Sequence, residues 1–83
     1  MQNNFVTNLH ILAALAEKEY ESKVSERGHS WETIYTSFEY LEYANSHLKV
    51  AGEAYVGAMP KWIVKSNIVK TLVYLNMALA RLE

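Results

Sequence analysis

The chain contains no cysteine and no aspartate, and it has only one proline and three glycines. Without cysteine it forms no disulfide and offers no thiol nucleophile, and this absence fits a reducing, cytoplasmic location. The three histidines, His10, His29 and His47, do not have His-Glu-x-x-His spacing, and no glycine-rich phosphate loop is present. We therefore expect a protein that is not an enzyme and that holds no metal or cofactor.

The chain also lacks an excess of charge of either sign. It has eight Lys and Arg residues and nine acidic residues, which gives a net charge of −1. This balance argues against a DNA- or RNA-binding protein, which needs a basic face. The glutamates concentrate in residues 17–53, whereas the charged residues of the segment 61–81 are all basic. The two segments can pair, within one chain or between chains, at about 0–1 kcal/mol for each surface ion pair.

Long hydrophobic runs are absent as well. The apolar stretch 9–16 is interrupted by His10 and has no Lys or Arg before it, so we do not expect a secretion signal. Lys65 and Lys70 divide the apolar last part of the chain into pieces too short to span a bilayer. No membrane contact is expected.

Apolar residues, by contrast, make up 51% of the sequence and include six tyrosines. A domain of 83 residues buries only a small core, so this content exceeds what one monomer covers. We interpret the excess as a sign that the protein self-associates and contacts a protein partner.

Apolar periodicity predicts three helices joined by two short turns. Gly28 and Ser30 are typical of the end of one helix and the start of the next, and Pro60 suits the first turn of the last helix. We predict one all-α domain, either a three-helix bundle or a long helical hairpin plus a third helix, with the first two helices antiparallel. The expected helices span about residues 5–27, 31–59 and 61–82.

The middle helix carries the clearest pattern, a seam in which apolar positions recur at alternating steps of three and four residues. Such heptad spacing keeps one stripe of a helix facing a partner helix. Asn45 occupies a seam position, and Asn76 plays a similar part in the last helix. A buried amide would set helix register or oligomer state, whereas the alternative is a local or water-mediated hydrogen bond. The seam comprises Trp31, Ile34, Phe38, Leu41, Asn45, Leu48, Gly52, Tyr55 and Met59.

A second stripe, rich in tyrosine, lies almost opposite the seam on the same helix. Small residues between the two faces, such as Ala44 and Ala51, permit close approach of another helix. A three-helix monomer covers one face and part of another, so we predict that the tyrosine-rich stripe is left as an interface. The alternative is that its tyrosines lie along the surface with their hydroxyls in water. The predicted interface residues are Tyr40, Tyr43, His47, Val50 and Ala54.

The last helix ends with an aromatic residue, an asparagine two positions later, and the run Ala-Leu-Ala-Arg, here Tyr74, Asn76 and residues 78–81. This pattern resembles the C-terminal helix of small phage proteins that sequester cyclic nucleotides and so blunt CBASS (cyclic-oligonucleotide anti-phage) immunity; it covers only residues 66–81. The resemblance implies an oligomer of helical hairpins, with nucleotide pockets lined by aromatic and basic groups at subunit contacts. The candidate anion-binding residues are Lys61, Lys65 and Lys70.

In the stretch 47–57, His47 is followed by a nearby lysine, Lys49, and by a glycine ten residues later, Gly57. This stretch is similar to the phosphoacceptor motif of histidine phosphotransfer domains, and the resemblance implies a phosphate-accepting His47. The sequence thus predicts, in order of preference, a self-associating binding protein, an oligomeric sponge for a cyclic nucleotide, and a phosphotransfer module.

Overall fold

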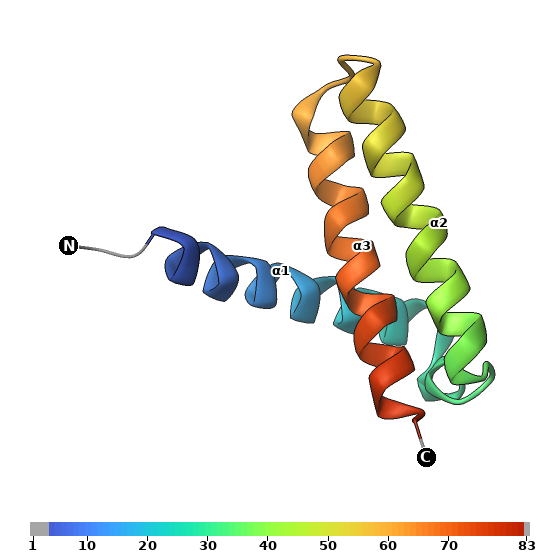
Figure 1. Ribbon diagram of the computed structural model, residues 1–83. Coiled ribbons are helices and arrows are strands. Elements are labelled where there is room, and N and C mark those ends of the chain that lie inside the picture. The colour runs from blue at the N-terminus through green and yellow to red at the C-terminus, as the bar shows by residue number, and fades with distance from the viewer. Residues whose placement is uncertain (1–3, 83) are drawn as a thin grey trace.

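The computed structural model of the chain describes residues 4–82, and this part of the protein is built from three α-helices (Figure 1). Helices α2 and α3 form an antiparallel hairpin, and α1 lies across this hairpin rather than alongside it (Figure 1). The all-α prediction is confirmed, as a helical hairpin plus a third helix. The elements are α1 (Asn4–Arg27), the short 3-10 helix η1 (His29–Glu32), α2 (Ser37–Val56) and α3 (Lys61–Ala80).

Helix α2 begins later than the heptad pattern predicts, because Thr36 caps it. The Thr36 hydroxyl accepts a hydrogen bond from the Glu39 backbone N–H at 3.2 Å, and the Glu39 carboxylate accepts one from the Thr36 N–H at 3.1 Å. This reciprocal capping box satisfies two backbone donors that would otherwise lack a partner. The prediction of one continuous helix from residue 31 is therefore wrong, and residues 33–36 form a turn after η1.

Residues 57–60 form the turn between α2 and α3. Ala58 adopts a φ of 53°, in the left-handed region that commonly ends a helix. The N–H groups of Ala58 and Met59 donate to carbonyls of the last turn of α2, at 3.2 and 2.9 Å. Pro60 then precedes α3, as expected from its fixed φ and missing N–H. The turn excludes Met59 from α2, so the predicted helix 31–59 is shorter at this end too.

An aromatic core lies at the end of the hairpin opposite this turn. Trp31 of η1 packs between Tyr20 of α1 and Tyr74 of α3, at ring-centroid distances of 5.9 and 6.2 Å. The Tyr40 hydroxyl donates to the Trp31 carbonyl at 2.5 Å, so η1 is bound to α2 as well. The core therefore ties all elements together at one end. Its buried members are Trp31, Tyr40, Ala44, Val73, Tyr74, Met77 and Ala78.

Helix α1 contributes no fully buried residue. Its second half packs on the core through Ala16, Tyr20 and Val24, whereas its first turns project from the hairpin (Figure 1). Gly28, at a φ of 79°, redirects the chain between α1 and η1. The predicted antiparallel pairing of the first two helices is not observed, because α1 packs on α3 and η1 instead.

Candidate functional site

Part of the tyrosine-rich stripe, which was predicted to be an uncovered interface, packs inside the hairpin, where Tyr40, Tyr43 and His47 contact Tyr74. Tyr40 and Ala54 are only 0% and 3% exposed. The ring of His47 stacks on the ring of Tyr74 at a centroid distance of 5.3 Å and an interplanar angle of 7°. The ring of Tyr43 also stacks on the Tyr74 ring, at a centroid distance of 5.4 Å. The prediction that this stripe is left uncovered is wrong for Tyr40, His47 and Ala54, which are buried or half-buried in the hairpin, whereas Tyr43 and Val50 are exposed.

Hydrogen bonds within the chain engage the polar groups of Tyr40, Tyr43 and His47. His47 Nδ1 lies 3.1 Å from Asn67 Oδ1 of α3. A hydrogen bond with Tyr35 raises the pKa of Tyr43, and burial raises the pKa of Tyr40. Only the outer members of the stripe, Tyr43 and Val50, keep about two fifths of their surface exposed.

His47 also differs from the phosphoacceptor that the phosphotransfer resemblance implies. Its ring is half-buried and stacked on Tyr74, whereas Lys49 is exposed. Residues two positions apart on a helix do not share a face. An exposed histidine with a lysine beside it is therefore not found at this position.

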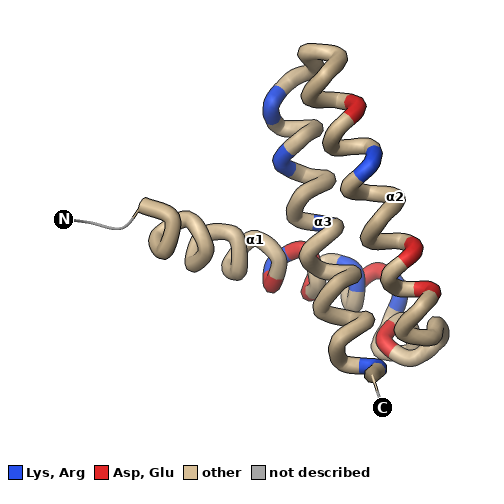
Figure 2. Tube along the Cα trace, in the orientation of Figure 1, with Lys and Arg blue, Asp and Glu red and all other residues tan. Residues whose placement is uncertain are grey.

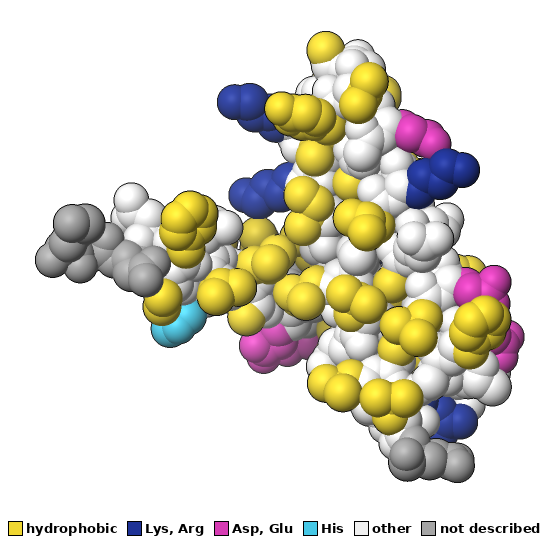
Figure 3. All heavy atoms as spheres, in the orientation of Figure 1, with side chains coloured by type: hydrophobic (Ala, Val, Ile, Leu, Met, Phe, Trp, Pro, Cys, Tyr) yellow, Lys and Arg dark blue, Asp and Glu magenta, His cyan; other side chains and the backbone are white. Residues whose placement is uncertain are grey.

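The heptad positions of α2 form the exposed face instead. We call this face the outer seam. Its aromatic residues at the two ends, Phe38 and Tyr55, are 68% and 76% exposed. The space-filling view shows hydrophobic side chains spread over the visible face of the hairpin and along α1 (Figure 3). The outer seam comprises Phe38, Leu41, Asn45, Leu48, Gly52 and Tyr55, all exposed.

Small residues explain why α3 covers the other side of α2. Ala44 and Ala51 are buried against α3, where their short side chains allow the two helices to approach closely. The Ser37 hydroxyl donates to the Ala78 carbonyl at 2.5 Å and joins the same two helices near the start of α2. The hairpin thus uses the small-residue edge and the tyrosine-rich stripe together, and it leaves the heptad positions free.

The two amides that were predicted to align helices are both exposed. Asn45 belongs to the outer seam, and Asn76 borders a hollow between α1 and α3 together with Tyr20 and Leu72. The prediction of buried amides is therefore wrong for the single chain. A register role of Asn45 between chains stays a prediction that depends on what covers the outer seam.

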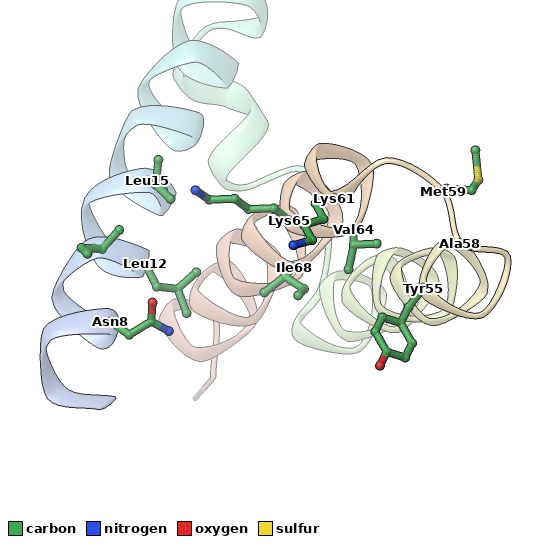
Figure 4. Close-up of a pocket in the computed structure, with 11 residues that line it drawn as sticks. Asn8, Leu12, Leu15, Tyr55, Ala58, Met59, Lys61, Val64, Lys65 and Ile68 are labelled. Atoms are coloured by element: carbon green, nitrogen blue, oxygen red, sulfur yellow. The ribbon is translucent and has the colours of Figure 1, made fainter. Parts of the chain in front are cut away.

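A groove of about 570 Å³ opens between α1 and the turn that joins α2 to α3. Leu12 of α1 and Ile68 of α3 contribute apolar walls, and Tyr55 borders the side away from α1 (Figure 4). Two of the predicted anion-binding residues, Lys61 and Lys65, line this groove. No carboxylate of residues 4–82 forms an ion pair with either lysine.

The third candidate cation, Lys70, does not line the groove, and it is half-buried on α3. Charge is only partly divided along the hairpin: the two lysines of the groove lie near the α2–α3 turn together with Glu53, and Glu39 and Glu42 lie near the opposite end together with Arg81 (Figure 2). The groove therefore combines two lysines with a predominantly apolar lining.

The described residues 4–82 contain no group of three His, Cys, Asp or Glu side chains placed to hold a metal ion. Within that range, no helix has both the length and the apolar character that crossing a membrane requires. Two surfaces are consequently the candidate binding sites of this chain: the outer seam of α2 and the basic groove beside α1.

In comparisons with known proteins, no family model, no curated protein and no solved structure matches the chain.

Proposed function

We propose that this protein is a small non-catalytic binding protein that self-associates, and contacts a protein partner, through the outer seam of α2. The observation that supports the proposal is the exposed heptad pattern itself. Phe38, Leu41, Leu48 and Tyr55 are all exposed at the spacing by which helices pack on one another.

The energetics favour covering this face. Full burial of a large apolar side chain stabilises by about 1.5–3 kcal/mol relative to leaving it in water. Monomeric proteins rarely expose a contiguous apolar patch of more than a few hundred Å². The capping box and the aromatic core hold α2 in place, so a partner does not have to order this helix first.

Light scattering across a tenfold dilution series tests this proposal. We expect a mass above that of the 9.5 kDa chain, and we expect Phe38→Glu and Leu48→Glu to shift it to the monomer value because each places a charge in the apolar contact. Ser46→Glu, at an exposed position of α2 outside the seam, is the matched control and leaves the mass unchanged. A wild-type protein that is monomeric at every concentration would contradict self-association.

A second candidate function is sequestration of an anionic aromatic ligand such as a cyclic nucleotide. The groove supports it, since Tyr55 can stack on a base while Lys61 and Lys65 bind phosphates. Calorimetry with a cyclic dinucleotide tests this function: Lys61→Gln and Lys65→Gln should weaken binding, added salt should weaken it further, and Lys70→Gln should have little effect. Equal effects of all three substitutions would argue against the groove.

A further inference from the structure

We infer that the outer seams of two copies pair antiparallel, about a two-fold axis that crosses the seam at the level midway between residues 46 and 47. This inference rests on the proposed self-association and specifies its geometry. Its occupant is a second copy of this chain, and the evidence is the distribution of size and charge along the exposed face of α2.

The outer seam lies where a helix of a four-helix bundle receives its second neighbour. At about 100° per residue, the seam is centred roughly 110° around α2 from the face that packs on α3. The α3-facing side is marked by the buried residues Tyr40, Ala44, Ala51 and Ala54. Two hairpins that join through α2 therefore build a four-helix arrangement in which each α2 has α3 on one side and the other α2 on the next.

An antiparallel register about this axis matches the one small residue of the seam, Gly52, with a large one. It places Leu41 opposite Gly52 of the second copy, and Gly52 opposite Leu41 by symmetry. Apart from its chain neighbours and the backbone of its own helix turn, a Cβ added at Gly52 would meet no atom within 4 Å, so nothing in the rest of the hairpin requires a glycine at this interior helix position. A second chain that approaches closely at Gly52 gives the glycine a physical purpose.

The same register brings the remaining seam residues together. Phe38 lies opposite Tyr55 of the second copy, which forms an aromatic pair at each end of the contact. Asn45 lies opposite Leu48, and the two Asn45 residues are offset by only about 4.5 Å along the axis. The amides are then close to the axis, where one polar layer can set the register.

Charge complementarity distinguishes the antiparallel from the parallel arrangement. Glu42 and Lys49 flank the seam on one edge, and both are exposed. The antiparallel register brings Glu42 of each copy beside Lys49 of the other, so two opposite-charge pairs form. A parallel pair would place these charges beside the uncharged residues Ser37 and Ala44, and Gly52 would face Gly52.

Disulfide cross-linking tests the register, because the chain has no cysteine of its own. We would prepare Leu41→Cys and Gly52→Cys separately and oxidise each alone and as a mixture. The antiparallel register puts these two positions opposite each other, whereas identical positions are about 16 Å apart along the axis, beyond disulfide reach. We expect covalent dimer in the mixture and little in either variant alone; dimer in both single variants and no gain on mixing would overturn the inference in favour of parallel pairing.

Charge reversal provides a second readout that a folding defect does not imitate. Glu42→Lys or Lys49→Glu alone should weaken dimerisation by about tenfold, since each turns two attractive pairs into repulsive ones. The double variant, Glu42→Lys with Lys49→Glu, should recover the wild-type affinity. Failure of the double variant to recover would overturn the register.

The outcomes separate this inference from the proposed function on which it rests. A wild-type protein that stays monomeric in light scattering overturns both. A wild-type oligomer that shows neither cross-linking in the mixture nor rescue by the double charge reversal overturns the antiparallel register and leaves self-association standing. An oligomer with both signals establishes it.

Discussion

Tyr74 is the residue that decides which face of α2 turns inward. Its ring contacts Trp31, Tyr40, Tyr43 and His47, from η1 and from α2, and it is 7% exposed. None of these contacts is local in sequence. The tyrosine-rich stripe of α2 was therefore visible in the sequence, but its partner on α3 was not.

Replacement of Tyr74 by alanine should destabilise the hairpin strongly. Removing a buried aromatic side chain costs about 3–5 kcal/mol, which combines lost burial with a residual cavity. Urea unfolding followed by circular dichroism measures the change. Trp62→Ala, at an exposed position on the same helix, is the control and should stay within about 0.5 kcal/mol of the wild type. Similar losses in both variants would contradict the central role of Tyr74.

Glu32 provides a pH-dependent contact between η1 and α1. Two hydrogen bonds lower the pKa of the Glu32 carboxyl below its ordinary value of 4.5. The bond from Tyr20 of α1 has the larger effect and the bond with His29 the smaller one. A carboxyl whose pKa is lower in the folded state contributes stability above its unfolded pKa. That contribution is lost as the pH falls below 4.5 and through the folded value.

We therefore expect the melting temperature to fall on acidification below about pH 4.5, with part of this fall absent in Glu32→Gln. Thermal scans between pH 7 and pH 3 measure the effect. Glu53→Gln, an exposed site on α2, is the matched control. The same acid dependence in the wild type and in Glu32→Gln would show that this contact does not contribute.

Among the elements, α2 shows how a cap outweighs apolar periodicity. The heptad spacing runs on through Trp31 and Ile34, yet Trp31 lies in η1 and Ile34 in the following turn. The sequence Thr36-x-x-Glu39 is a capping-box signature, so the start of α2 could have been predicted from the sequence. Side-chain spacing alone cannot locate a helix start, because η1 and a turn can continue the same order of apolar residues.

Thr36→Ala should shorten or loosen the start of α2. Loss of an N-cap hydroxyl costs about 0.5–2 kcal/mol of stability. Thr33→Ala is the control, because the Thr33 hydroxyl only donates to the Ser30 carbonyl at 3.3 Å in an exposed turn. Chemical unfolding should show a clear loss for Thr36→Ala and almost none for Thr33→Ala. Equal losses would mean that the cap does not set the start of α2.

For the molecule as a whole, stability is concentrated at one end of the hairpin. The aromatic core joins η1, α2, α3 and the second half of α1, whereas Phe5 at the start of α1 is 85% exposed. Segments with few buried apolar contacts open at lower free energy than the core. The first turns of α1 and the core of α3 should therefore differ in dynamics.

Hydrogen exchange followed by mass spectrometry measures this difference. We expect amides of residues 8–13 to exchange much faster than those of residues 71–78, because only the latter segment is buried. Comparison of two protein concentrations serves as the control for association. Protection of residues 8–13 as strong as that of α3 at low concentration would show that α1 is held by contacts other than those of the core.

Composition and periodicity by themselves determined the all-α class, the approximate helix positions, the excess of apolar surface and the presence of two apolar faces on α2. These properties are local, because propensity and side-chain spacing act within one segment. Only the tertiary structure decided which face of α2 became core. A helix with two apolar faces has no local preference between them, and Tyr74 together with the small residues Ala44 and Ala51 let α3 cover the tyrosine-rich side. The heptad positions were left outside, and the interface that we propose therefore lies on the other side of α2 from the one predicted.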